Sequence, residues 1–357
     1  MPLAVLCSVA VAGFLVPMDI HLASLLVAVP ALTAGLVGPR FTVGLTVAAC
    51  AAAATLDVYD GLLDSPILPI HVLDLLVVCG LVVVFWRLRD LDSQALLQVR
   101  TVSDAAQRAV LRPLPRRMGS LRIASMYRSA AAQAQIGGDL YAAERVKGAV
   151  RLIIGDVRGK GLAAVDDAAA VLGAFREAAH RDAALSELVA SLEGSVRRHL
   201  RSVGETDRDS GEHFITALVL EIPDDPPVVR LISCGHPPPL RSHDGRALAL
   251  RSPQPAPPLG LAGAGEEYHV DTFKFDAGDT LLLHTDGLLE ARDATGAFYP
   301  ATDRFASLRW RDPDQLLQRL VMDLLDHVDG HLEDDVGLVA MERVEENTSF
   351  PEQACER

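Results

Sequence analysis

The sequence predicts an α+β domain of antiparallel sheets and flanking helices, preceded by a helical transmembrane segment. Two observations lead to this prediction. Positions 1–86 are apolar and hold one arginine, Arg40, with no lysine or glutamate. Beyond about residue 120, extended apolar runs follow one another with only two long helical interruptions, and such an order favours antiparallel sheets. We therefore expect a membrane segment followed by a separately folded domain.

The first 86 residues contain four apolar runs, at about 3–16, 19–38, 42–56 and 67–86. The second and fourth approach the roughly 20 residues that a bilayer crossing requires. The first and third are shorter, so tilted or interfacial placements are alternatives. A secretory signal peptide is a rival interpretation of the first run, but no basic segment precedes it. We predict about four transmembrane helices.

The few charges in this region predict an orientation. Arg40 lies between the second and third runs, and Arg87 and Arg89 follow the fourth. Arginines near membrane ends stay on the cytoplasmic side. This pattern predicts a multi-pass plasma-membrane protein, with the lipid bilayer as a partner and both termini in the cytoplasm. His71 and Asp74, near the start of the fourth run, fit the headgroup level better than a sensing site within the membrane.

A helical connector is predicted at 87–117. Its apolar residues recur every three or four positions over about three heptads, before two prolines end the pattern. The stripe consists of Leu88, Leu91, Ala95, Val99, Val102, Ala106 and Ala109. Two interpretations are equal: the helix pairs two copies into a homodimer, or it packs on its own domain.

The domain itself is predicted at 118–344, with a polar tail at 345–357. Strands are expected at 121–127, 149–157, 214–222, 228–234, 268–275, 279–285 and 335–341. Helices are expected at about 162–200 and 313–330, the second beginning with Asp312 and Pro313 as N-cap and first-turn residues. The segment 223–227 joins two strands as a hairpin loop.

The composition excludes some classes of function. A net charge of −14 argues against nucleic-acid binding, because phosphate contacts need a concentrated basic surface. The five cysteines are scattered, without a C-x-x-C pair, and are interpreted as reduced packing residues.

Four acidic motifs stand out: GGDLY (137–141), GDVRGKG (155–161), HTDG (284–287) and EDD (333–335). A single Asp-Gly pair is most often a turn, but four such motifs favour a shared site. Hard oxygen ligands without a His or Cys cluster select Mg²⁺ or Mn²⁺ over zinc. The candidate ligands are Asp139, Asp156, Asp286, Asp334 and Asp335.

In order and wording these motifs resemble the PPM-type metal-dependent serine/threonine protein phosphatases, in particular the bacterial SpoIIE/RsbU-like group. The likeness spans about 118–344. It includes a P-L-P-x-R lead-in that begins at Pro113, ISCGHPPPL at 232–240, HTDGLLEARD at 284–293 and DDVGLVAM at 334–341. The resemblance implies two stacked antiparallel sheets flanked by helices, with the metal site at one end of the sandwich.

The resemblance also implies residue roles and a reaction. Two Mn²⁺ or Mg²⁺ ions would activate a water that hydrolyses phosphoserine or phosphothreonine. The substrate would be a regulatory phosphoprotein such as an anti-sigma-factor antagonist. The residues implied as catalytic and metal-binding are Asp139, Asp156 with the carbonyl of Val157, Asp286 and Asp334, and Asp335 would be a neighbour that orients them.

The sequence departs from the family pattern in three places. Ala142 stands where many relatives have Asp, Lys160 where His is common, and Gly337 where Thr or Ser is usual. Lys160 and Arg158 either contact the incoming phosphate or are solvated loop charges. His236 fits a structural hydrogen bond better than a general acid.

Two other classes of function compete with the phosphatase. A catalytically weak, phosphatase-like signalling or binding module is favoured by Ala142 and Gly337, and is opposed by the retained aspartates. A nucleotide cyclase is suggested by GGD, but it needs an acidic residue after Asp139, where Leu140 stands.

Overall fold

The computed structural model describes residues 110–130, 138–159, 161–204, 213–263 and 265–345, together with short helical pieces between 44 and 91. The chain divides into two compact units, 1–98 and 99–357. The polar tail from 346 onward, Lys160, and most of the connector lie outside the described residues.

The predicted membrane location is not supported by the first unit. Residues 46–49 and 84–91 are among its described residues and are helical. Among these residues no helix is long and apolar enough to span a bilayer. The prediction of a multi-pass plasma-membrane protein with a cytoplasmic domain is therefore wrong. A crossing needs about 20 apolar residues in one helix, and the helices of the described residues do not supply this. His71 and Asp74 lie outside the described residues.

The second unit contains two antiparallel sheets, as predicted. Its described strands pair only in the antiparallel sense within each sheet. One sheet has the order β1 (Arg117–Met118), β2 (Leu121–Arg128), β11 (Val336–Arg343), β10 (Thr280–His284), β7 (Leu240–His243) and β8 (Arg246–Ala249). The other has the order β3 (Asp139–Val146), β4 (Ala149–Val157), β5 (Ile215–Pro223), β6 (Val228–Cys234) and β9 (Asp271–Lys274).

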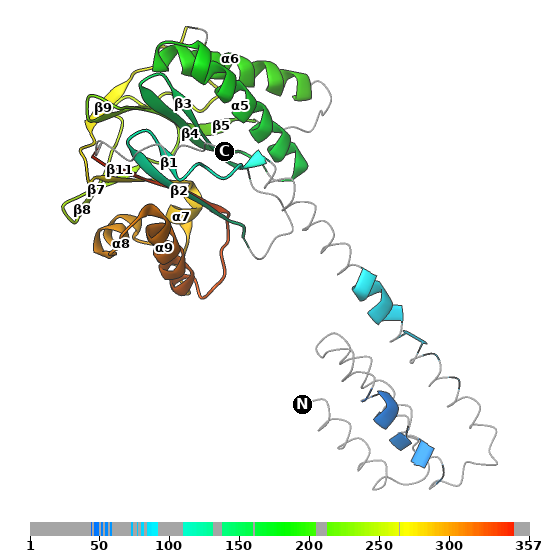
Figure 1. The fold of residues 1–357 in the computed structure, drawn as a ribbon. Helices are drawn as coiled ribbons and strands as arrows, with labels where there is room; N and C mark the ends of the chain where they lie inside the picture. Colours follow the sequence, from blue (N-terminus) through cyan, green and yellow to red (C-terminus); the bar gives the residue numbers. More distant parts are fainter. Residues whose placement is uncertain are drawn as a thin grey trace, which may run out of the picture. The chain divides into compact units, whose positions relative to one another are not determined.

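Helices cover the outer faces of both sheets (Figure 1). Helices α5 (Leu162–Arg181) and α6 (Leu185–Gly204), drawn in green, pack on the β3–β4–β5–β6–β9 sheet and share one buried apolar cluster with it. Helices α7 (Asp286–Glu290), α8 (Ala301–Ser307) and α9 (Pro313–His327) form another cluster with the opposite sheet. A third cluster fills the space between the sheets. The result is a four-layer α/β/β/α sandwich.

Burial explains the elements that the sequence predicted best. Strand β4 is covered on both faces, so its sequence AVRLIIGDV is almost continuously apolar, and its limits match the predicted 149–157. Strand β6 likewise matches the predicted 228–234. Helix α9 begins as predicted: the Asp312 side chain accepts a hydrogen bond of 2.8 Å from the Gln315 backbone N–H.

The predicted helix at 162–200 is two helices instead. The chain is extended at Asp182, and the buried Arg151 guanidinium donates to the carbonyl oxygens of Ala179, Asp182 and Ala183 around the break. These tertiary hydrogen bonds satisfy the carbonyls that the end of α5 leaves free. Local periodicity cannot reveal such a break.

Strand β3 was not predicted, because GGDLY reads as a turn. In the structure Asp139 is already the first residue of a strand paired with β4 along its whole length. Strands β7 and β8 and the short helices α7 and α8 were also missed. Each is too short for a hydrophobic period to stand out.

Candidate metal centre

Two of the predicted ligands meet across one strand pair. Asp139 begins β3, and Asp156 lies directly opposite it near the end of β4. Asp139 is buried, with 4% of its surface exposed. Their strands belong to the same sheet, so pairing register alone brings these two carboxylates together at its edge.

The other acidic residues come from the opposite sheet. Asp286 opens α7 immediately after β10, and Asp334 and Asp335 immediately precede β11. Strands β10 and β11 are neighbours whose register joins His284 to Leu338. A methyl group on Gly287 would overlap the carbonyl oxygen of Asp335, so glycine permits this close approach. We call Asp139, Asp156, Asp286, Asp334 and Asp335 the acidic cluster.

The pKa values of Asp139, Asp156 and Asp286 reflect the nearness of other members of the acidic cluster. Burial raises the pKa of Asp139 well above its usual value, and repulsion from Asp156, Asp335 and Asp286 adds to this effect. Burial, followed by repulsion from Asp286, Asp334 and Asp335, raises the pKa of Asp156 to about 7. The pKa of Asp286 is also raised, by burial and then by Asp334.

This clustering is what a cation site requires. Buried carboxylates that repel one another are costly unless an opposite charge offsets them. The residues fit a divalent ion in donor chemistry, since all the side chains offer hard oxygens. Within the described ranges, however, no three acidic, His or Cys side chains converge closely enough to enclose an ion as they stand.

Asp335 differs from the other aspartates in its hydrogen bonds. One carboxylate oxygen accepts from the Tyr127 hydroxyl and the other from the Ala130 backbone N–H, each at 2.7 Å. Asp334 is exposed, and its Oδ1 accepts from the Asp335 backbone N–H at 2.9 Å. Asp335 is thus anchored to the end of β2, and Asp334 extends beyond it toward solvent.

The carbonyl of Val157 lies against the start of the first motif. The Val157 N–H donates to the carbonyl oxygen of Gly138 at 3.1 Å. A methyl group on Gly138 would overlap the Val157 carbonyl oxygen and lie 2.8 Å from Oδ1 of Asp156. Glycine is therefore required at position 138 for space. The motif GGDLY shows this glycine, but the contact that requires it is visible only in the structure.

Thr285 is a polar residue of the site that sequence reasoning did not assign. It is fully buried between β10 and Asp286. Its hydroxyl donates to Oδ2 of Asp139 at 3.1 Å and accepts from the Gly337 N–H at 2.9 Å. The signal was its position within HTDG, directly before a candidate ligand.

The histidine of CGHPPPL has a structural environment. His236 is buried, its Nε2 pairs with the His284 carbonyl oxygen at 3.1 Å, and its Nδ1 pairs with the Thr216 hydroxyl at 3.0 Å. Burial lowers the pKa of His236 to about 3. The ring is therefore neutral and fully hydrogen-bonded, which fits the predicted structural role.

Ala142, one of the departures from the family pattern, and Arg158 lie in different environments. Ala142 is buried within β3, in the cluster shared with α5 and α6. Arg158 is exposed, with its guanidinium 5.0 Å from the centre of the Phe214 ring.

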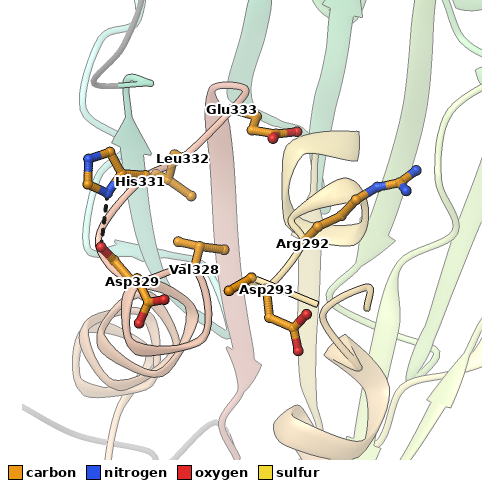
Figure 2. Close-up of a pocket in the computed structure, with 8 residues that line it drawn as sticks. Arg292, Asp293, Val328, Asp329, His331, Leu332 and Glu333 are labelled. Carbon is orange, nitrogen blue, oxygen red and sulfur yellow. Dashed lines mark hydrogen bonds between the residues drawn. The ribbon is translucent and has the colours of Figure 1, made fainter. Parts of the chain in front are cut away.

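The domain has a pocket of about 570 Å³ (Figure 2). It lies between the segment that follows α7 and the segment that follows α9. Arg292 and Asp293 line one side, and His331, Leu332 and Glu333 line the other. Glu333, which lines the pocket, directly precedes the candidate ligand Asp334 in the sequence.

Comparisons with known proteins identify the family of this chain and agree with its fold. A family model for stage II sporulation protein E (SpoIIE) matches residues 147–344, more than half of the chain. The matched range contains every member of the acidic cluster except Asp139, which the β3–β4 register adds.

Solved structures of phosphatase domains share the fold. The RsbU and RsbW domains of Rv1364c from Mycobacterium tuberculosis are 26% identical, with a TM-score of 0.53 over 67% of this chain and 64% of that one. The PP2C phosphatase domain of SpoIIE from Bacillus subtilis, with a fragment of its regulatory domain, is 16% identical, with a TM-score of 0.52 over 64% of this chain and 65% of that one. The SiaA PP2C domain of Pseudomonas aeruginosa is 18% identical, with a TM-score of 0.54 over 71% and 98%.

A curated relative matches a smaller part. Protein IcfG of Synechocystis is 28% identical over 116 residues, which cover 31% of this chain and 18% of that protein. The chain therefore spans less than a fifth of this relative. The family match covers β4 to β11, and the described domain has the PP2C-type architecture. This chain belongs to the stage II sporulation protein E family.

Proposed function

We propose that this chain is a protein serine/threonine phosphatase that depends on Mn²⁺ or Mg²⁺. The observation that carries the proposal is that Asp139, Asp156, Asp286 and Asp334 come from both sheets and lie near enough to interact: beyond the effect of burial, Asp286 raises the pKa of Asp139, and Asp334 raises the pKa of Asp156 and of Asp286. Family membership adds independent support, because the predicted phosphatase-type domain and the matched family agree.

The acidic cluster would hold the metal. Asp139, Asp156, Asp286 and Asp334 would bind two ions, with the Val157 carbonyl as a further oxygen, and Asp335 would orient its neighbour through its bonds to Tyr127 and Ala130. When bound, such ions activate water and neutralise phosphate charge. Strand ends and Gly-permitted contacts set the positions of these carboxylates.

A phosphorylated protein is the proposed substrate. The pocket beside Glu333 offers room for residues of the substrate next to its phosphoserine or phosphothreonine. The structure of the mycobacterial relative contains an RsbU domain together with an RsbW domain. By analogy, an anti-sigma-factor antagonist or a similar regulatory protein is the partner class we propose.

The test is hydrolysis of p-nitrophenyl phosphate and of a phosphoserine protein by the purified chain, with Mn²⁺, with Mg²⁺ and with chelator. We expect turnover only with metal. Asp286→Asn should abolish it, while Asp303→Asn, an exposed residue of α8, should not change it. Full activity of Asp286→Asn would refute the proposal.

A catalytically weak binding module is the alternative, and Gly337 and Ala142 are the residues that favour it. It predicts metal binding and substrate binding without turnover. Glu333→Gln tests whether the pocket binds the protein part of the substrate. It should raise KM for the phosphoprotein and leave hydrolysis of p-nitrophenyl phosphate unchanged.

The domain limits and a dimer are also proposed. We infer a catalytic domain at 118–344, with a helical connector at 87–117 that pairs two chains and a polar tail at 345–357. The stripe from Leu88 to Ala109 supports pairing by its heptad spacing. Sedimentation should give a larger species for 87–344 than for 118–344, and identical monomers would refute this role.

A further inference from the structure

Thr285 joins the two sheets at the acidic cluster. It follows β10 in one sheet, and its hydroxyl reaches Asp139, the first residue of β3 in the other. Its backbone N–H also donates to the carbonyl oxygen of Gly337 at 3.0 Å, which continues the β10–β11 pairing by one residue. The backbone of Thr285 is therefore held in place, and its side chain is free of solvent.

The direction of each hydrogen bond follows from the chemistry of the groups. The Gly337 N–H can only donate, so Oγ1 of Thr285 accepts from it at 2.9 Å. The single hydroxyl proton then remains for Oδ2 of Asp139, 3.1 Å away. An ionised carboxylate only accepts, so this arrangement is complementary to a charged Asp139.

Gly337 supplies the space that this arrangement needs. Its φ does not lie in the left-handed region, so backbone conformation does not demand glycine here. A methyl group at this position would lie 3.0 Å from Oδ2 of Asp139 and 3.2 Å from Cγ2 of Thr285. Both contacts are tighter than ordinary van der Waals distances. A side chain at 337 would thus push on the carboxylate that Thr285 holds.

We propose that Thr285 is a positioning residue for Asp139: it fixes the rotation of this carboxylate by one hydrogen bond, in a space that Gly337 leaves open. The inference rests on the proposed function, because it assigns Asp139 to a metal site. It adds two residues to the site: Thr285, which donates a hydrogen bond to Asp139, and Gly337, which leaves room for that carboxylate. Metal binding depends on both. Removing a group that orients a ligand commonly costs roughly 10–100-fold in metal affinity.

The experiment is Mn²⁺ titration of the full chain by calorimetry, with three variants at threonines of the β10 segment. Thr285→Val keeps the shape and removes the hydroxyl, and it should weaken Mn²⁺ binding by roughly 10–100-fold. Thr285→Ser keeps the hydroxyl and should bind like the wild type. Thr280→Val makes the same change at the buried, opposite end of β10 and should leave binding unchanged.

A second pair of measurements separates positioning from general damage. In Thr285→Val the Gly337 amide loses its acceptor, so its hydrogen exchange should accelerate relative to Thr280→Val. Gly337→Ala should weaken Mn²⁺ binding while Thr285 is intact. If Thr285→Val binds Mn²⁺ with the same affinity as the wild type, the positioning role of Thr285 is overturned, while the proposed function is not. Absence of Mn²⁺ binding by the wild type would overturn the proposed function, and this role with it.

Discussion

Asp139 and Asp156 are cross-strand partners: the register of β3 and β4 places the two carboxylates directly opposite each other. Like charges in this position destabilise a sheet, and burial raises the pKa of both groups further. The domain retains an unfavourable pair at the edge of an otherwise apolar strand. A bound cation would convert this repulsion into attraction.

Asp156→Asn should therefore stabilise the domain in chelator and weaken its response to metal. Removing the opposed charge should raise the free energy of unfolding by on the order of 1 kcal/mol without metal. Mn²⁺ should raise the melting temperature of the wild type, because it binds only the folded state, and should raise that of the variant much less. Calorimetric melting with and without Mn²⁺ checks both effects. Equal Mn²⁺-induced shifts would contradict a role for Asp156 in binding.

Arg151 should be one of the most important polar residues for stability. Its side chain, 5% exposed, forms an ion pair with Glu221 at 2.9 Å and also holds the carbonyls at the end of α5. Arg151→Met removes the donor to three carbonyl oxygens at the end of α5 and leaves Glu221 paired only with Arg230, and it should cost about 3–5 kcal/mol of unfolding free energy.

Arg230→Met is the matched control, because Arg230 pairs with the same Glu221 at 2.9 Å but is 40% exposed. It should cost less than about 1 kcal/mol. Denaturant unfolding of both variants measures the difference. Similar losses in the two would show that burial does not decide the strength of these pairs.

Gly287 and Gly173 should respond oppositely to the same substitution. Gly287→Ala places a methyl group against the Asp335 carbonyl and should destabilise the domain by about 1–3 kcal/mol. It should also weaken Mn²⁺ binding, because the segments carrying Asp286 and Asp334 must separate. Gly173→Ala lies on α5 with open space around it and should stabilise by about 0.5–1 kcal/mol. Thermal melting of both variants is the measurement, and destabilisation of Gly173→Ala would be unexpected.

His243 should make stability depend on pH. Its Nδ1 pairs with the buried carboxylate of Asp279, which raises the pKa of His243 above its usual value; Asp244 adds to this, and Arg241 opposes it. A raised folded-state pKa contributes stability below the unfolded value of about 6.5, and this contribution is lost as pH rises through the folded value.

The His243→Gln variant should therefore be more destabilised, relative to the wild type, at about pH 5.5 than at about pH 9. Melting temperatures of both proteins at the two pH values test this. A destabilisation that is the same at both would show that the imidazolium charge is not involved.

The sequence by itself determined the fold class and the chemistry of the site. Continuous apolar runs marked β4 and β6, because both strands are covered on two faces, and Asp-Gly motifs marked the carboxylates at strand ends. These signals are local, so they can be read from neighbouring residues alone. Apolar composition was not a sufficient signal for the membrane crossings: among the described residues of the first unit, no helix is long and apolar enough to cross a bilayer.

The tertiary structure decided which groups meet. Asp139 faces Asp156 only through the β3–β4 register, and a strand was not expected at GGDLY. The break between α5 and α6 depends on Arg151, which lies on a strand that precedes both helices. The contact of Thr285 with Asp139 spans two sheets and 146 positions of sequence. Long-range packing and hydrogen bonds of this kind leave no periodic trace in the sequence, because the partners are brought together only when the two sheets stack.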